Sequence, residues 1–194
     1  MLWNSDNAAA NAVEAWFGGS TSGGSALVNA LMRSIGLTHT EMYGGYVIGT
    51  RLLAGPQPGI PARVDEQPWF GAGKKTTAHD LAGLARAVWL ASGGLGALRR
   101  AQPGFTPADA RYLLYLLARV QHGSKLARVV ERAPDVVVAH KAGWIDSARH
   151  DAGLVFWRGG VFAVAVMTYR PGAGRSSDVL AGRVAATALA RFRG

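Results

Sequence analysis

One short stretch, residues 139–144, combines residue types that could contact a substrate directly. It reads Ala-His-Lys-Ala-Gly-Trp and follows the valine-rich run 135–138, so we expect it to end a β-strand. Lys141 would bring a positive charge, and Gly143 would leave the strand edge without a side chain. A substrate could then pair with that edge through main-chain hydrogen bonds. The same pattern is also typical of a solvated turn lysine, so the stretch alone decides nothing.

A second polar stretch, Ser5-Asp6-Asn7, precedes an alanine-rich run that favours a helix. Three small polar residues at this place are most often a helix N-cap. A serine hydroxyl also both donates and accepts hydrogen bonds, which suits a proton relay. An asparagine amide can donate to and accept from another amide. Both interpretations stay open from these residues alone.

Together, and in this order, the two stretches resemble Ser-Asp-Asn and Lys-Thr-Gly, two of the three signature elements of serine β-lactamases and penicillin-binding proteins. Residues 76–82 resemble the helix start after the active-site loop of that family. Residues 141–169 resemble its last three strands, and the final run resembles its C-terminal helix. The resemblance covers nearly the whole chain and is closest to the class A β-lactamase-like serine hydrolases. It implies acyl transfer on β-lactam or D-Ala-D-Ala-like amides.

The resemblance also implies a role for each matching residue. Ser5 would relay a proton to the leaving-group nitrogen, and Asn7 would bind the amide side chain of an acylamino substrate. Lys141 would place positive charge near the substrate carboxylate. Gly143 would let the substrate lie against the strand, and the backbone N–H of Trp144 would be one of two oxyanion-hole donors.

The departures from the family pattern are specific. Ala142 replaces the threonine or serine whose hydroxyl contacts the carboxylate; Arg149 on the next strand could compensate, or could form a local charge pair with its neighbours. Class A enzymes carry a deacylating glutamate in Glu-x-x-Leu-Asn, and the residues around Glu41 do not match that motif. We therefore expect slow release of an acyl-enzyme.

The nucleophile motif Ser-x-x-Lys is missing from the sequence. The residues three before the four lysines are Gly71, Ala72, His122 and Val138. We therefore expect the chain to be the C-terminal portion of a longer enzyme, or the product of a shortened gene. A non-catalytic protein that binds peptide or cell-wall fragments on the same scaffold is the alternative. A basic surface-binding protein without a pocket is a third possibility.

Composition narrows the remaining classes. The 194 residues include no cysteine, which excludes disulfides and thiolate zinc sites, and the five histidines show no metal-ligand spacing. We expect no cofactor. The formal net charge is +9, but the arginines are scattered and no nucleic-acid motif is present. The sequence begins without a signal-peptide pattern and has no apolar run of bilayer-spanning length; members of the resembled family are usually exported.

The period of the hydrophobic residues predicts an α+β order of elements, and the resemblance implies a β-lactamase/transpeptidase-like fold that is truncated at its N-terminus. One domain, 1–194, is expected to be mostly helical over 1–134 and to form antiparallel strands and a covering C-terminal helix over 135–194. We expect helices at 7–17, 25–35, 77–89, 106–121, 124–131 and 176–192, and strands at 135–144, 149–157 and 161–169. Residues 18–24 should form a flexible loop, and residues 39–70 a long irregular one.

Three expectations concern packing. Val13, Trp16 and Phe17 are candidate core contacts of the first helix. The last helix should face the sheet through Leu180, Val184, Leu189 and Phe192. The strand 161–169 is apolar on both faces, and in the resembled family it pairs with strands that precede the nucleophile. We expect it to be an open edge here, through which copies of the chain could associate.

Overall fold

The computed structural model describes residues 1–46, 74–121, 123–131, 133, 135–145, 147–169 and 174–194. The chain divides into two compact units. The first contains Met1 and Ser5–Thr76, and the second contains Leu2–Asn4 and Thr77–Gly194. Each unit is described by itself. The expectation that both belong to one domain stays a prediction, and most of the expected loop at 39–70 lies outside the described residues.

Two packed helices, α1 (Asn7–Gly18) and α2 (Thr21–Ser34), make up most of the described part of the first unit. Gly19, at φ 75°, ends α1, and the Ser20 side chain caps α2 by accepting from the Gly23 amide. The expectation of a flexible loop at 18–24 is therefore wrong, because α1 ends at Gly18 and α2 begins at Thr21. Its glycines instead allow close packing: a Cβ atom on Gly24 would lie 2.5 Å from the main-chain oxygen of Glu14.

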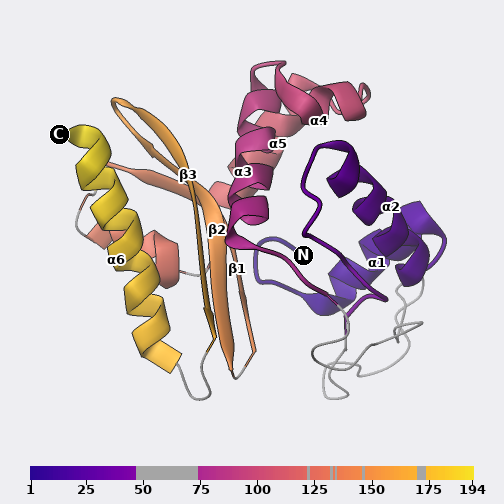
Figure 1. Ribbon diagram of the computed structural model, residues 1–194, viewed down its shortest axis with the longest axis horizontal. Helices are drawn as coiled ribbons and strands as arrows, with labels where there is room; N and C mark the ends of the chain where they lie inside the picture. The colour runs from indigo at the N-terminus through magenta and orange to yellow at the C-terminus, as the bar shows by residue number, and fades with distance from the viewer. Residues whose placement is uncertain (47–73, 122, 132, 134, 146, 170–173) are drawn as a thin grey trace. The chain divides into compact units, whose positions relative to one another are not determined.

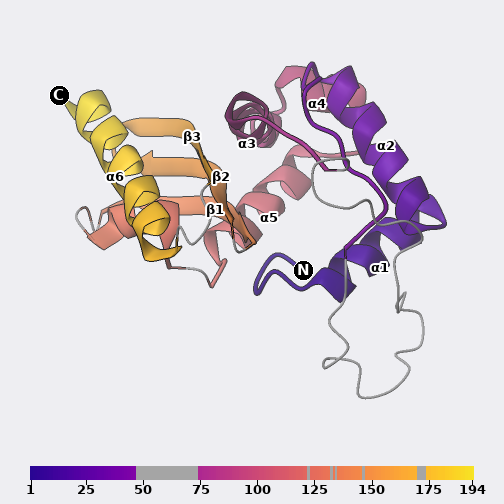
Figure 2. The ribbon, with the colours of Figure 1, turned by 60° about the horizontal axis from the view of Figure 1, so that its bottom comes forward.

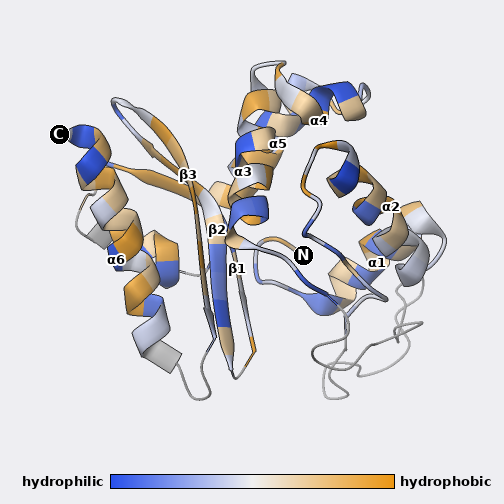
Figure 3. Ribbon diagram, viewed as in Figure 1, coloured by the Kyte–Doolittle hydropathy of each residue, from blue (hydrophilic) through white to orange (hydrophobic). Residues whose placement is uncertain are grey.

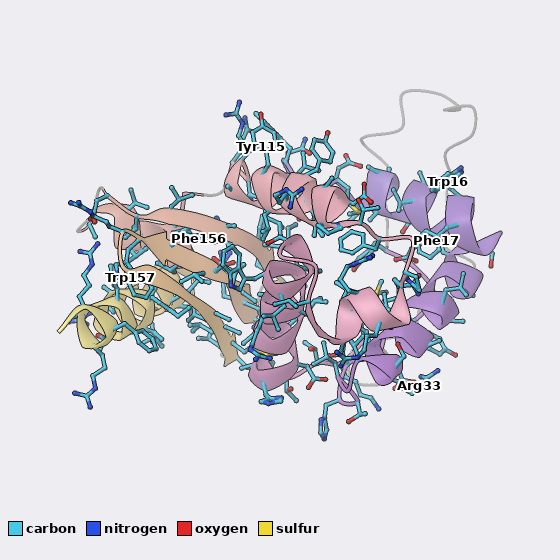
Figure 4. All side chains as sticks on the ribbon, turned by 90° about the horizontal axis from the view of Figure 1, so that it is seen from above. Trp16, Phe17, Arg33, Tyr115, Phe156 and Trp157 are labelled. Carbon is cyan, nitrogen blue, oxygen red and sulfur yellow. The ribbon has the colours of Figure 1, made fainter. Side chains whose placement is uncertain are left out.

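The buried positions of these two helices are largely polar. In α1 the buried residues are Asn11 and Glu14, whereas Val13, Trp16 and Phe17 are 42%, 87% and 40% exposed. Figure 4 shows Trp16 and Phe17 on this helix. The expectation that these three apolar residues form core contacts is wrong, because the helix turns its polar side inward.

Two asparagines in the first unit hold the segment that follows the helices. Asn11 accepts from the Tyr46 amide at 2.7 Å and donates to the Tyr46 carbonyl at 2.8 Å. Asn29 in α2 makes the same two bonds to Met42, at 2.7 and 2.8 Å. An amide side chain with one donor and one acceptor imitates the exchange between neighbouring β-strands. Each helix thereby fixes one point of residues 42–46.

A three-stranded antiparallel sheet organises the second unit (Figure 1). Its order is β1 (Val137–Trp144), β2 (Ala148–Trp157) and β3 (Gly160–Tyr169). A turn of two residues, 158 and 159, joins β2 and β3, since Trp157 lies opposite Gly160. Among the strands that the structure describes, β3 pairs only with β2, so it forms an edge, as expected.

Helices cover both faces of this sheet, as Figures 1 and 2 show. One face packs against α6 (Gly174–Arg193) and the 3-10 helix η2 (Lys125–Glu131), and the other against α3 (Ala78–Ser92). Helix α5 (Pro107–Ala118) contacts α3 and β1. Thr77 caps α3 by accepting from the Asp80 amide, and Thr106 forms a full capping box at the start of α5. A short helix, α4 (Gly96–Ala101), was not expected.

Alternating side chains along β2 reach opposite faces. Phe156 makes an edge-on contact with Trp89 of α3, with ring centroids 5.4 Å apart. Its neighbour Trp157 stacks at 6.1 Å on Phe192 of α6. Figure 4 shows Phe156 and Trp157 on the sheet. This alternation fixes which face each residue of the sheet presents.

The core between the sheet and α6 consists of aliphatic residues and one phenylalanine. It is formed by Leu126, Val129, Ala133, Val136, Val138, Val155, Phe162, Val164, Val166, Ala181, Ala185 and Leu189. The expected contacts of α6 are partly wrong. Leu189 is buried as expected, but Leu180 and Val184 are 48% and 38% exposed. Alanines at 181 and 185 face the sheet instead, because small side chains let the helix approach closely.

Candidate functional site

The structure divides the predicted site residues between the two units. Ser5 and Asn7 belong to the first unit, whereas Lys141, Ala142, Gly143, Trp144 and Arg149 belong to the second. The second group is brought together, because antiparallel pairing places Trp144 opposite Arg149. The predicted convergence of Ser5, Asn7 and Lys141 on one cleft stays a prediction.

At the start of α1, the capping role falls to Asp6 rather than to its neighbours. Its carboxylate accepts from the Ala9 amide at 2.6 Å. Asn7 is the first helical residue and is exposed. Ser5 has φ 60°, in the left-handed region that few residues other than glycine adopt. Such a backbone costs free energy and is found more often at functional sites than elsewhere.

The main-chain direction along β1 follows from the pairing at its end. The Ile145 amide donates to the Ala148 carbonyl at 2.9 Å, and the Ala148 amide donates back at 3.4 Å. In an antiparallel pair these exchanges occur at every second residue. With the continuous register of β1 and β2, the N–H and C=O groups of Ala142 and Trp144 therefore point away from β2. They line the outer edge of the sheet.

Gly143 makes that outer edge accessible. It is exposed, and a Cβ atom added there would have no heavy atom within 4 Å. By contrast, a Cβ atom on Gly153 in β2 would lie 2.2 Å from the Ala139 carbonyl oxygen. Glycine is thus required by packing at 153 but not at 143. The space beside Gly143 is what a ligand lying along β1 would occupy.

Lys141 carries the positive charge at this edge. Its ammonium group donates to the carbonyl oxygen of Ala142, one of the outward-pointing main-chain groups. Burial lowers the pKa of Lys141, the Asp151 carboxylate acts in the opposite direction, and the positive charge of Lys125 lowers the pKa further. A partly desolvated ammonium group interacts more strongly with an approaching anion than one in water.

A buried polar cluster supports the strand end on which Lys141 lies. The Nδ1 atom of His140 is 2.9 Å from both carboxylate oxygens of Asp151, and the two residues are 3% and 1% exposed. Asp151 also accepts from the Leu126 amide at 3.0 Å. This carboxylate thus ties β1, β2 and η2 together. Figure 3 shows a hydrophilic stretch on β2.

Sequence reasoning missed this cluster. The hairpin register, counted back from the turn, places Asp151 opposite Ala142 and two positions from Gly153, the partner of His140. Two polar residues on the inward face of neighbouring strands would then have predicted a buried pair. Lys125 was also missed, and nothing in the short run around it indicates that a lysine there is only 2% exposed.

Arg149 lies on the same face of the sheet as Trp144, its cross-strand partner. Its Nη1 atom is 3.9 Å from the carboxylate of Asp178 in α6. Neither Arg149 Nε nor Asp178 Oδ1 has a hydrogen-bond partner among the residues that the structure describes. The expected local charge pair between Arg149 and its neighbours is therefore wrong. Asp151 binds His140, and the carboxylate near Arg149 is that of Asp178.

The family of this chain follows from a comparison with known proteins. The sequence matches the profile of the β-lactamase enzyme family over residues 1–192. The chain belongs to the β-lactamase enzyme family. The resemblance inferred from the two short motifs is thereby confirmed, and so is the α+β fold. No curated protein matches the chain.

Solved structures with the same fold include penicillin-binding proteins and β-lactamases. A mutant of PBP-A, in an acyl-enzyme complex with penicillin G, has a TM-score of 0.60 at 20% identity over 88% of this chain and 52% of its own. A β-lactamase from Sphaerobacter thermophilus has a TM-score of 0.63 at 17% identity, with coverages of 86% and 53%. A β-lactamase from Burkholderia vietnamiensis has a TM-score of 0.60 at 18% identity, over 90% of this chain and 55% of its own. The chain thus spans about half the length of these relatives.

Other features of the described residues do not add to this site. An apolar hollow in the second unit is lined by residues of α3 and α5 and by Phe156, and no predicted site residue lines it. The described part of the chain contains no cluster of histidine, aspartate and glutamate that could hold a metal ion. Among its helices, none is long and apolar enough to cross a membrane.

Proposed function

We propose that this chain forms the substrate-binding half of a serine β-lactamase-like hydrolase that acts on β-lactam or D-Ala-D-Ala-like amides by acyl transfer. The nucleophile would come from residues outside these 194, because Ser-x-x-Lys does not occur among them. The observation that carries the proposal is the outer edge of β1, where outward-pointing main-chain groups, a bare glycine and a half-buried lysine lie together.

The chemistry of this edge suits an acyl compound with a carboxylate. The backbone N–H of Trp144 would donate to the oxygen that becomes negatively charged in the tetrahedral intermediate. Lys141 would attract the carboxylate and stabilise it in a partly desolvated place. Arg149, two positions from Asp151 along β2, would supply a second cation where Ala142 lacks the hydroxyl of its family counterparts.

The first unit would supply the remaining groups. Ser5, with its left-handed backbone, lies just before the capped helix α1. That hydroxyl would relay a proton to the leaving-group nitrogen. Asn7, at the exposed first turn of α1, would bind the acylamino side chain of the substrate. The glutamate that class A enzymes use for deacylation has no counterpart in the motifs of this chain, so release of the acyl group would be slow.

Covalent labelling tests the assignment of the nucleophile. The chain of 194 residues should show no stoichiometric mass increase after incubation with a labelled penicillin. A serine adduct found by mass spectrometry would overturn this part of the proposal and reveal a nucleophile other than the family type.

Non-covalent binding tests the site itself. In an NMR titration, N-acetyl-D-Ala-D-Ala should shift the amide resonances of 142–144 at millimolar concentration, and the L-Ala-L-Ala peptide should shift them less. Lys141→Met should abolish the shifts, whereas Lys75→Met, at an exposed ion pair with Glu41, should not. Shifts that are equal for both peptides, or that lie elsewhere, would contradict the proposal.

A non-catalytic binding protein on the same scaffold is the second candidate, since the edge of β1 could bind a peptide without any nucleophile. The two candidates differ in what a longer version of the chain would do. An enzyme extended by an in-frame segment with Ser-x-x-Lys should hydrolyse a chromogenic cephalosporin. A binding protein should bind the D-Ala-D-Ala peptide and leave the cephalosporin intact.

Self-association through β3 belongs to the same proposal. The strand alternates buried and half-buried residues, and its outer edge has no partner strand in the described part of the chain. Such an edge favours pairing with another chain. The chain alone should therefore form dimers or larger species at high concentration. Strong amide protection of 161–169 in a dilute monomer would show that the edge is already covered.

A further inference from the structure

Lys125 has an environment that a lysine rarely adopts. Its side chain is among the most buried in the chain, with a residue exposure of 2%, and its φ of 62° is left-handed. Its Nζ atom lies 4.5 Å from the centre of the Trp144 ring. A cation above an indole face is attracted by the ring electrons.

Neighbouring elements fix the backbone of Lys125 from two sides. The next residue, Leu126, donates its amide to Asp151 of β2 at 3.0 Å. On α6, a Cβ atom added to Gly182 would lie 3.1 Å from the Lys125 carbonyl oxygen. A glycine at 182 therefore lets α6 pack directly on this turn. A left-handed residue held in this way has a fixed side-chain direction, here toward Trp144.

The charges around Lys125 extend to the proposed site. Burial lowers its pKa, Asp178 of α6 and Asp151 of β2 raise it, and Arg149 of β2 lowers it. Its own charge in turn lowers the pKa of Lys141 on β1. The two lysines therefore interact with each other and share the Asp151 carboxylate.

We propose that Lys125 is a positioning residue: its ammonium group on the Trp144 ring holds the end of β1 so that the Trp144 N–H and the Lys141 ammonium group face a bound carbonyl compound together. The inference rests on the proposed function for its consequence in binding. Its structural part does not depend on the proposed function. That part is the contact between the Lys125 ammonium group and the Trp144 ring, which we call the clamp.

If the side chain at position 125 only filled space in the core, an aliphatic residue would be expected there. A buried ammonium group costs desolvation free energy that an aliphatic side chain of the same length does not. Trp144 is 45% exposed, so its ring is not held by burial alone. The clamp explains both facts, because it orders a half-exposed side chain whose own backbone lies at the outer edge of β1.

Lys125→Met is the main test, because methionine keeps the length of the side chain and removes its charge. Lys125→Arg is the conservative rescue, since a guanidinium group also stacks on an indole. Arg119→Met is the matched control: the Cζ atom of Arg119 lies 5.2 Å from the centre of the Tyr115 ring in the same unit, a contact in which no proposed site residue takes part.

Three measurements on the full chain apply to these variants. In the unmodified protein, the Lys125 Hε resonances should be shifted upfield by the ring, and Trp144→Leu should remove that shift. A side-chain NMR titration of Lys141 should show a higher pKa in Lys125→Met than in Lys125→Arg. The dissociation constant of N-acetyl-D-Ala-D-Ala should rise about three- to tenfold in Lys125→Met and return in Lys125→Arg.

The outcomes separate the two proposals. An absent ring shift in the unmodified protein, or an unchanged pKa of Lys141 in Lys125→Met, would overturn the positioning role whatever the peptide does. If Lys125→Met does not fold, the ring shift and its loss in Trp144→Leu decide the clamp alone. If the peptide binds neither the unmodified protein nor any variant, the proposed function fails instead. An effect of Arg119→Met as large as that of Lys125→Met would show a general loss of stability and overturn the role.

Discussion

In the first unit, α1 and α2 bury asparagine, glutamate, threonine and serine side chains, whereas the sheet of the second unit packs valine, leucine and alanine against α6. The first unit gains its order from hydrogen bonds between side chains and main chain and from close glycine contacts. The second gains it from removal of apolar surface from water. The same chain thus contains two different sources of structural order.

The two sources have different consequences for the predicted site. In the second unit, the aliphatic core ends at the cluster of His140 and Asp151, which holds the end of β1 in a rigid frame. In the first unit, Asn11 fixes the segment at Tyr46 by two hydrogen bonds, and these can break one by one. We therefore expect the site residues on β1 to be more rigid than residues 42–46, which follow α2.

The largest expected effect tests the apolar side of the comparison. Leu126 is fully buried in the core below the sheet, so Leu126→Ala should lower the free energy of unfolding of the second unit by about 2–5 kcal/mol. Hydrogen exchange should show the loss over β1–β3 and α6. Val130→Ala, at a residue 38% exposed in the same 3-10 helix, serves as control and should cost much less. Equal costs would show that this core is not the main source of stability.

A smaller effect tests the polar side. Asn11→Ala removes two hydrogen bonds and leaves the Tyr46 amide and carbonyl without them, at a cost of about 1–3 kcal/mol. Exchange of the amides at 42–46 should accelerate most. Val13→Ala on the same helix should change exchange little, because Val13 is 42% exposed. A larger effect at Val13 would mean that the first unit has an apolar core after all, and the contrast between the units would fail.

This contrast also explains what the sequence could predict. Apolar periodicity located the strands, α3 and α6, because those elements bury aliphatic side chains. It failed in α1, where Trp16 is 87% exposed and Asn11 is buried, since a hydrogen-bonding amide gives no periodic signal. The glycines of 18–24 predict a flexible loop, whereas the structure shows that Gly24 allows close contact with α1. Composition does not distinguish these two uses of glycine.

For the site, short motifs identified the end of β1 because main-chain pairing needs few specific side chains. They could not identify Lys125, which lies sixteen positions before Lys141 and reaches Trp144 only through the turn of η2. Nor did they identify the pairing of His140 with Asp151, which depends on strand register rather than on neighbouring residues. Tertiary contacts of this kind follow from the fold and not from local sequence.

The substitution with the smallest expected effect on stability is the most informative one, because it separates the stability of the sheet from ligand binding at its edge. Gly143→Ala adds a methyl group in open space on β1, so the free energy of unfolding should change by less than about 0.5 kcal/mol. The same methyl group lies where a ligand would approach the strand, and binding of N-acetyl-D-Ala-D-Ala should fall sharply. Gly153→Ala on β2 is the opposite control, because its methyl group would clash with the Ala139 carbonyl and unfold the sheet. Thermal unfolding and the NMR titration measure the two effects. Normal peptide binding by a stable Gly143→Ala variant would show that the outer edge of β1 is not the binding surface.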